Sequence, residues 1–256
     1  IYDSVKNSYS LDKVESPEQF YITAKAFGRF AYDLNDFDAS QLVEVIPQFH
    51  DTRNRYRQLE EAIREDRVGR VKEVQEEIAF IQNRKADCFL LYDLLDEGVL
   101  PLRVTHNDTK LNNIMFDSET KEPLCIVDLD TVMPGLVLFD FGDSIRFGAN
   151  DCAEDEPDLS KVNFDFDLYE TYVKGFIEGT NGILTEAELE YLPWGARVIT
   201  LEQGIRFLTD YINGDVYYAT TRPGQNLDRA RTQLKLVQDM ENVWDKMVEA
   251  VKNAQK

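Results

Sequence analysis

The chain has 256 residues, 43% of them hydrophobic, and its 28 basic and 48 acidic residues give a formal net charge of −20. This composition is typical of a globular protein, and the acidic balance argues against nucleic acid as a partner, because phosphate backbones are bound through clustered Lys and Arg. No apolar run approaches the roughly eighteen residues that a membrane span needs, so we expect none. The three cysteines cannot all pair, which favours reduced thiols and a cytoplasmic location.

Helices are predicted over the first third of the chain. Ser16 is a typical N-cap and a proline follows it at the first helical position, so the first helix is expected to begin there. Charged, periodic segments predict further helices over residues 52–66, 68–82 and 88–95. His50 precedes them in a turn that we expect to pack between helices, outside any site.

The middle of the chain predicts short strands around a polar loop. Residues 102–105 and 113–116 flank this loop, and residues 124–127 form a short apolar run suited to a buried strand. The acidic run 151–158 comes later. It lacks the ligand spacing and central glycine of an EF-hand, so we interpret it as a solvated loop.

The last third again predicts helices. Thr185 and Glu188 form a capping box ahead of one helix, residues 199–211 predict another that stops at Gly214, and a final helix is predicted over residues 227–251. No internal repeat or low-complexity linker marks a second domain. The chain is therefore expected to be α+β and mainly helical.

The polar loop carries the pattern that points to chemistry. His106, Asp108, Lys110 and Asn113 fit H-x-D-x-K-x-x-N, the spacing of kinase catalytic loops, and Asp128 follows the next apolar run. Phosphoryl transfer requires an aligned hydroxyl, a neutralised triphosphate and the exclusion of water. The loop therefore predicts a phosphoryl-transfer site.

Each of these side chains has a predicted role. Asp108 would accept a hydrogen bond from the attacking hydroxyl and help to remove its proton, and Asn113 and Asp128 offer the oxygen ligands that Mg²⁺ prefers. Lys110 would reach the γ-phosphate, and His106 would orient the loop, so we group Asp108, Lys110 and His106 as catalytic. A polar loop of this kind also arises by chance, but the flanking strands would deliver the acids and the amide to one place.

Three stretches, residues 105–113, 127–135 and 139–146, resemble those of one superfamily. They are similar to the aminoglycoside phosphotransferases and choline kinases, and most closely to the N-acetylhexosamine 1-kinases. The resemblance implies a protein-kinase-like fold and an enzyme that uses ATP and Mg²⁺ to phosphorylate the anomeric hydroxyl of N-acetylglucosamine or N-acetylgalactosamine. It implies the same catalytic and metal-binding residues as the motif, and it makes Asp140 a brace of the catalytic loop. Asn107 departs from the glycine usual in the aminoglycoside branch, which weakens an antibiotic-resistance interpretation.

The resemblance also implies a small, strand-rich nucleotide lobe ahead of the helical lobe. Only residues 1–15 precede the first predicted helix, and the sequence contains no glycine-rich phosphate loop. We therefore expect residues 1–15 to be a remnant of the last strand and hinge of that lobe. Residues 16–256 are expected to form the helical lobe that carries the catalytic and metal-binding loops, so that the N-terminal nucleotide lobe is absent.

The acceptor site is expected near helix 199–211. Glu202, Arg206 and Asp210 recur at a spacing of four residues, and Tyr217 follows. One interpretation is a sugar pocket in which Arg206 reaches a substrate oxygen and Tyr217 packs its ring on the pyranose. The other is a surface ladder of ion pairs with a core tyrosine. The residues alone favour neither, whereas the resemblance favours the sugar pocket.

Together these features predict a kinase whose substrates are a small-molecule sugar and a nucleotide. Asp108, Arg206 and Tyr217 would contact the acceptor, and Asn113 and Asp128 would hold the Mg²⁺-nucleotide. An aminoglycoside or choline kinase is the alternative. A non-catalytic binding module is a third interpretation, disfavoured because the catalytic and metal-binding residue types are all present.

Overall fold

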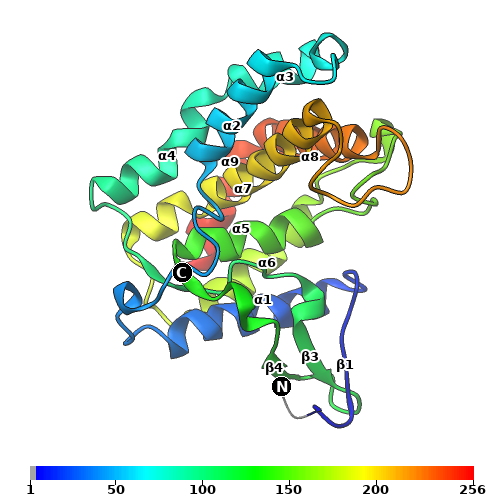
Figure 1. Ribbon diagram of the computed structural model, residues 1–256. Coiled ribbons are helices and arrows are strands. Elements are labelled where there is room, and N and C mark those ends of the chain that lie inside the picture. The colour runs from blue at the N-terminus through cyan, green and yellow to red at the C-terminus, as the bar shows by residue number, and fades with distance from the viewer. Residues whose placement is uncertain (1–3) are drawn as a thin grey trace.

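The computed structural model describes residues 4–256 and has a mainly helical α+β fold, as predicted (Figure 1). The helices are α1 (Pro17–Asp33), α2 (Thr52–Glu65), α3 (Gln75–Gln82), α4 (Lys85–Asp96), α5 (Val137–Gly148), α6 (Phe166–Gly179), α7 (Glu186–Asn213), α8 (Gln225–Asn242) and α9 (Trp244–Ala254). The strands are β1 (Ser8–Tyr9), β2 (Arg103–Thr105), β3 (Ile114–Asp117), β4 (Pro123–Ile126) and β5 (Met133–Gly135). In Figure 1, α2 and α3 lie at one end of the molecule, α5 and α7 in the middle, and α1 with strands β1, β3 and β4 at the other end.

Helix α1 begins where the sequence predicts. The Ser16 side chain accepts a hydrogen bond from the Gln19 amide, and Pro17 is the first helical residue. The helix packs along α6, and Gly28 permits this close approach, because a Cβ here would collide with the carbonyl oxygen of Phe176. The α1–α6 pair forms a layer that also contacts β2 and β4.

Two small antiparallel sheets carry the loops of the site. Strand β3 lies between β1 and β4 in one sheet, and β2 pairs with β5 in the other. Strands β3 and β4 form a hairpin in which Ile114 lies opposite Ile126. The residues just before β3 and just after β4 therefore meet at the open end of the hairpin, where Asn113 and Asp128 lie.

The segment that we assigned to the remnant of a nucleotide lobe lies against this hairpin. Strand β1 pairs antiparallel with β3, with Ser8 opposite Asp117. The ring of Tyr9 packs against the ring of Phe116, with their centroids 5.8 Å apart. Residues 1–3 of the segment lie outside the described residues. The assignment of residues 1–15 to another lobe stays a prediction.

Helix α7 joins two hydrophobic clusters. One lies around α1, α5 and α6, and the other lies around α2, α3, α7 and α8. The first half of α7 packs in the first cluster and its second half in the second. Gly142 of α5 faces Gly195 of α7 so closely that a Cβ on Gly142 would collide with the Gly195 carbonyl oxygen. These two glycines let α7 run directly over α5, which carries the support of the catalytic loop.

Two predicted helices are each divided. Residues 68–82 form one 3₁₀ turn (Val71–Glu73) followed by α3, because Asp66 ends α2 in a left-handed conformation and its carboxylate accepts the Val71 amide. The final predicted helix, 227–251, is α8 and α9, separated at Val243. This break allows the first residue of α9 to pack its ring against Trp194 of α7.

The predicted capping box and helix 199–211 belong to one helix. The Thr185 hydroxyl accepts the Glu188 amide, and the Glu188 carboxylate accepts the Thr185 amide. Helix α7 then continues for 28 residues and ends at Gly214, which has a φ of 99°. Its length is what places Glu202 and Arg206 on the same rigid element as the residues that pack on α5.

Candidate active site

Two carboxylates of helix α5 accept backbone amides of the catalytic loop, which lies between β2 and β3. The Asp140 carboxylate accepts the amides of His106 (2.9 Å) and Asn107 (2.7 Å), and Asp143 accepts the amide of Thr109 (3.0 Å). Burial raises the pKa of Asp140 to about 6, although the two amide donors act in the opposite direction. The structure thus places Asp140 beneath the catalytic loop, where it fixes two consecutive peptide groups.

Asn107 adopts a left-handed conformation with φ 65°, which glycine tolerates best and asparagine better than most residues. Its side chain makes use of this position. The Thr105 hydroxyl donates to Asn107 Oδ1 (3.0 Å), and Asn107 Nδ2 donates to the Thr131 carbonyl oxygen (3.0 Å). An asparagine here therefore ties the catalytic loop to the segment ahead of β5, which a glycine could not do.

Asp108 lies at the edge of a cavity with its carboxylate held on both sides. Lys110 Nζ lies 2.7 Å from Asp108 Oδ1. Asn113 Nδ2 donates to the Asp108 carbonyl oxygen (2.8 Å) and to Oδ2 (3.2 Å). The Asp108 side chain keeps 20% of its surface exposed, and Lys110 keeps 37%. Both groups can therefore meet a substrate from the cavity side.

The open end of the β3–β4 hairpin brings together the two residues that we assigned to a metal ion. Asn113 is buried and Asp128 is exposed with φ 61°, and the amide of Val127 donates to the Asn113 carbonyl oxygen (2.9 Å). Since Asn113 uses its amide nitrogen on Asp108, its oxygen Oδ1 is the atom that suits a cation. Within residues 4–256 no cluster of three or more His, Cys, Asp or Glu side chains is arranged to hold a metal. An amide oxygen and a carboxylate are ligand types that suit Mg²⁺, and the assignment of these two residues to a metal ion stays a prediction.

His106, which we grouped as catalytic, is fully buried behind the loop. Its Nε2 faces the Val127 carbonyl oxygen at 3.0 Å, and the rings of Phe27 and Phe30 pack on it edge to face. Its Nδ1 has no hydrogen-bond partner among the described residues. The side chain does not line the cavity, so its place in the catalytic group is corrected: it connects the loop to Val127, which lies between β4 and Asp128.

The cavity beside Asp108 has a volume of about 490 Å³. Charged or hydrogen-bonding groups and aromatic rings alternate around its wall. The residues that line it are Phe49, His50, Asn107, Asp108, Lys110, Thr131, Asp143, Arg146, Phe147, Glu154, Ile199, Glu202, Gln203, Arg206, Phe207, Tyr218, Ala219 and Arg229. It is large enough for a small molecule of the size of a monosaccharide.

Arg206 lies in the wall contributed by α7. Its Nη1 donates to the neutral amide of Gln203 (3.2 Å). Its guanidinium lies over the rings of Phe49 (5.6 Å from the centroid) and Tyr218 (5.7 Å). The residue is thus positioned by stacking and by a neutral partner, and its charge faces the cavity.

Tyr217, which we predicted to contact the sugar, is 74% exposed and lies outside the cavity wall, and Tyr218 lines the cavity instead. The reason is the buried carboxylate of Asp210, which accepts the amides of Val216, Tyr217 and Tyr218. This clamp fixes the backbone so that the Tyr218 ring lines the cavity while the Tyr217 ring packs edge to face on its outer side, with the two centroids 4.8 Å apart. The alternative of a surface ladder is also wrong, because Glu202 and Asp210 are buried.

His50, which we left outside the site, lines the cavity. Its Nε2 lies 3.0 Å from the Asn107 carbonyl oxygen, and its Nδ1 lies 3.0 Å from Glu202 Oε1. The other oxygen of Glu202 accepts the Thr52 hydroxyl (2.6 Å). A lone histidine ahead of a helix N-cap carries no local signal of such contacts, since its partners lie 57 and 152 residues away in the sequence.

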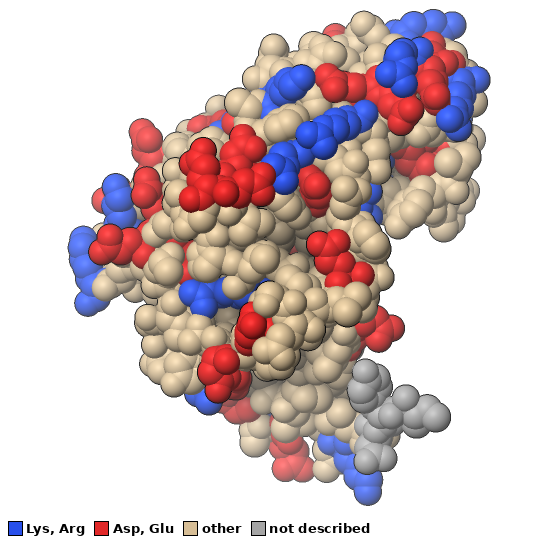
Figure 2. All heavy atoms as spheres, turned by 60° about the vertical axis from the view of Figure 1, so that its left-hand side comes forward, with Lys and Arg blue, Asp and Glu red and all other residues tan. Residues whose placement is uncertain are grey.

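The molecular surface carries both signs of charge. On the face drawn in Figure 2, Lys and Arg side chains lie interspersed with Asp and Glu. The net charge of −20 is therefore not gathered there into one acidic field. The charges that an acceptor would meet are therefore those of the cavity wall and do not follow from the overall composition.

The acidic run 151–158 is partly structural rather than only solvated. Glu154 pairs with Arg146 (3.0 Å), and Asp155 accepts the Gln225 amide (2.9 Å). Burial by itself would lower the pKa of Arg146, but the charges of Asp143 and Glu154 keep it above its ordinary value. The loop therefore closes one end of the cavity with an ion pair.

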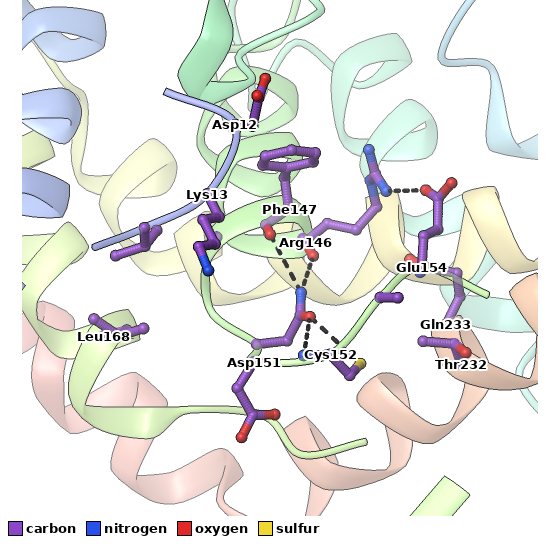
Figure 3. A pocket seen from close by; sticks show the side chains of 14 residues that line it. Asp12, Lys13, Arg146, Phe147, Asp151, Cys152, Glu154, Leu168, Thr232 and Gln233 are labelled. Carbon is purple, nitrogen blue, oxygen red and sulfur yellow. Dashed lines mark hydrogen bonds and ion pairs between the residues drawn. The ribbon is translucent and has the colours of Figure 1, made fainter. Parts of the chain in front are cut away.

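A second cavity of about 540 Å³ lies on the other side of this ion pair (Figure 3). The two cavities share Arg146, Phe147 and Glu154 as lining residues. Figure 3 shows Asp12 and Lys13 of the chain ahead of α1 on one side of this second cavity, and Gln233 of α8 on another. Asp108 lines the first cavity and does not line this one, so the first cavity is the candidate acceptor site.

Solved structures that are similar to this chain include kinases of small molecules. A choline/ethanolamine kinase family protein from Mesorhizobium loti is 16% identical, with a TM-score of 0.50 over 97% of this chain and 72% of that protein. A choline kinase from Cryptosporidium parvum Iowa II is 15% identical, with a TM-score of 0.52 over 96% of this chain and 73% of that protein. At this level of identity the likeness confirms the kinase-like fold alone.

A match to a protein-family model shows to which family the sequence is related. The model, described as the phosphotransferase enzyme family, matches residues 9–171. The match contains the catalytic loop, the β3–β4 hairpin and helix α5. With more than half of its residues matched, and with a loop built to present Asp108 to a cavity, this chain belongs to the phosphotransferase enzyme family.

Proposed function

We propose that this phosphotransferase moves the γ-phosphoryl group of Mg²⁺-ATP to the anomeric hydroxyl of N-acetylglucosamine or N-acetylgalactosamine. The observation that carries the proposal is the cavity beside Asp108, whose wall offers hydrogen-bonding groups and aromatic rings and whose carboxylates already have partners. No described helix is both long and apolar enough to cross a membrane, and the need for ATP favours the cytoplasm.

In this reaction the acceptor oxygen forms a bond to the γ-phosphorus while the bond between that phosphorus and the bridging oxygen of ATP breaks, so that ADP leaves. Asp108 accepts the hydrogen bond of the attacking hydroxyl and takes its proton as the new bond forms. Lys110 lies beside it and places a positive charge near the transferred group. Mg²⁺ held by Asn113 and Asp128 would neutralise the phosphate oxygens.

The charges of the wall favour a neutral acceptor over a cation. Asp143 and Glu154 both pair with Arg146, and Asp108 pairs with Lys110. The fourth lining carboxylate, Glu202, contacts His50. A choline or an aminoglycoside would have to displace Arg146, Lys110 or His50 to gain an ion pair, and displacing the buried Arg146 or His50 is costly.

The aromatic rings support the same choice. A quaternary ammonium group is recognised by open faces of aromatic rings. Here Arg206 lies over the rings of Phe49 and Tyr218, and Arg229 lies over the ring of Phe207 (5.5 Å). These guanidinium groups therefore occupy the ring faces that a choline head group would need.

A neutral sugar suits what the wall offers. Arg206 presents donors to sugar oxygens or to the carbonyl of an N-acetyl group, and Tyr218 offers an aromatic ring beside it. We assign the aromatic contact to Tyr218 in place of Tyr217. The choline kinase titles of the similar structures keep that acceptor class as the alternative, and a binding module without transfer activity is the other.

Phosphorus NMR tests the proposal. The full-length protein is mixed with Mg²⁺-ATP and, in separate samples, N-acetylglucosamine, N-acetylgalactosamine, choline and kanamycin, with Asp108→Asn as the matched control. We expect a sugar 1-phosphate signal with an N-acetylhexosamine that the control does not form at a comparable rate. Phosphocholine or phosphokanamycin alone would replace the sugar assignment, and no product with any of the four would favour the binding module.

A further inference from the structure

The chain contains two histidines, and the hydrogen-bond partners of their ring nitrogens differ. Within residues 4–256, His106 has one polar partner, the Val127 carbonyl oxygen at Nε2, and its Nδ1, in an aromatic environment, has none. His50 has a polar partner at each ring nitrogen: the Asn107 carbonyl oxygen at Nε2 and Glu202 Oε1 at Nδ1, both at 3.0 Å. A carbonyl oxygen and a carboxylate only accept hydrogen bonds.

We infer that His50 is an imidazolium ion which uses both N–H groups to connect helix α7 to the catalytic loop, and that it is a positioning residue for Asp108. A neutral imidazole has a single N–H, so one ring nitrogen would direct its lone pair at an acceptor. With Glu202 ionised, as its lowered pKa favours, only the protonated ring satisfies both contacts in a side chain that is 7% exposed.

The groups packed against His50 support a positive charge there. Glu202 faces it from α7, and Asp143 and Asp140 act on it from α5. The rings of Phe49 and Phe139 pack against its ring. Burial by itself would lower the pKa of His50, but the hydrogen bond and charge of Glu202, followed by the charge of Asp143, raise it above the ordinary value.

The contact with Asn107 connects this charge to catalysis. Asn107 immediately precedes Asp108 and adopts φ 65°, so its peptide group sets the direction in which the chain enters the catalytic residue. The Asp140 carboxylate accepts the amide of Asn107 (2.7 Å). His50 contacts the Asn107 carbonyl oxygen, and its other ring nitrogen contacts Glu202 of α7. Loss of the His50 proton would remove one donor, which leaves the loop free to turn away from its position.

The same contact links the loop to the acceptor. Glu202 lies on α7 four residues, about one turn, before Arg206. Helix α7 therefore carries both Arg206, which would contact the ligand, and Glu202, which contacts Asp108's neighbour Asn107 through His50. The role in positioning depends on the proposed function of Asp108, whereas the charge of His50 does not.

The first test detects the protons themselves. In full-length protein labelled with nitrogen-15 histidine, the ring signals that disappear in His50→Gln belong to His50. We expect both ring nitrogens of His50 to carry protons near neutral pH and to keep them above the ordinary histidine pKa of about 6.5. A His50 ring with one unprotonated nitrogen near neutral pH, and the proton on Glu202 instead, would overturn the inference.

The second test separates positioning from packing. His50→Gln retains one amide donor for two acceptors, so we expect kcat to fall about 10- to 100-fold while KM for ATP changes much less. In His50→Ala, added imidazole should restore more of the wild-type rate, compared at the same pH, under acidic than under alkaline conditions, because only the cation supplies two donors. Equal rescue at both pH values would reduce His50 to a residue that fills space and would overturn the positioning role.

Thr52→Val is the matched control, since Thr52 donates to the same Glu202 carboxylate (2.6 Å) but does not touch the loop. We expect it to change kcat much less than His50→Gln, and an equal loss would contradict a role specific to the loop contact. The NMR test needs no acceptor, and the kinetic test can use whichever acceptor is phosphorylated. Failure of the proposed sugar specificity is therefore distinguishable from failure of this inference.

Discussion

The two sides of the active site are built differently. The catalytic side takes Asp108, Asn113 and Asp128 from one short stretch of chain around the β3–β4 hairpin, and helix α5 supports it. The acceptor side takes residues from the turn before α2, from α7, from the loop after it and from α8, and only the packing of these helices brings them together.

This difference suggests that the chemistry and the choice of acceptor can be altered separately in this protein. A local stretch preserves the geometry of phosphoryl transfer, whereas the distant helices set the shape and charge of the cavity. Changes on the catalytic side should therefore alter turnover or metal use, and changes on the acceptor side should alter KM for the acceptor. The following variants can strengthen or break this division.

Asp108→Asn should have the largest effect. It retains the shape of the side chain but removes the base, so we expect kcat to fall by about two to four orders of magnitude with acceptor binding nearly unchanged. Steady-state kinetics and calorimetric binding of the acceptor measure the two quantities. Turnover close to that of the wild type would remove Asp108 from the mechanism.

Asp140→Asn tests the support beneath the catalytic side through the pH dependence of stability. The pKa of Asp140 is about 6 in the fold against an ordinary value of 3.8, so the folded protein binds this proton more tightly than the unfolded chain. The stability contributed by this group is therefore present at low pH and is lost as the pH rises from about 4 to about 6.

We expect the free energy of unfolding of the wild type, relative to that of Asp140→Asn, to fall by roughly 1–3 kcal/mol across this window. Urea denaturation at a series of pH values measures the difference. A difference that grows as the pH rises would show that the pKa of Asp140 is lowered rather than raised.

Asp128→Ala tests the metal-binding part of the catalytic side. It removes a proposed ligand, so we expect the Mg²⁺ concentration for half-maximal activity to rise about tenfold or more. Asp130→Ala is the matched control, because Asp130 is an exposed acid two residues further on. Equal Mg²⁺ requirements in the two variants would reject Asp128 as a ligand.

The pair Tyr218→Ala and Tyr217→Ala tests the acceptor side and should have the smallest effects. We expect the first to raise KM for the acceptor about tenfold, since Tyr218 lines the cavity, and the second to leave kcat and KM nearly unchanged, since Tyr217 is 74% exposed. The opposite order would return the sugar contact to Tyr217 and require the loop after α7 to rearrange on binding.

Much of the fold was predictable from local signals. Ser16 and Pro17 begin α1, the capping box begins α7, and Gly214 ends it, because caps act within one or two turns of a helix end. Residues 68–82 and 227–251 were predicted as unbroken helices. The first break accompanies a side-chain cap at Asp66, and the second, at Val243, allows Trp244 to pack on Trp194; periodicity does not report either of these contacts.

The site shows the same limit. That Asp108, Asn113 and Asp128 lie near one another could be predicted because their spacing along the chain determines their spacing around one hairpin, and their roles stay predictions. The choice between Tyr217 and Tyr218 could not, because it depends on the buried Asp210 carboxylate that holds the loop.

The sequence by itself determined the reaction class, since the catalytic residues and the hairpin that presents them lie within one short stretch of chain. The tertiary structure alone decided which side chains face the acceptor and which charges they carry. His50 acquires its partners only when α7 packs on α5 and α2, and a proton on a buried ring depends on the acceptors placed around it. Contacts of this kind join residues far apart in the chain, so no local pattern encodes them.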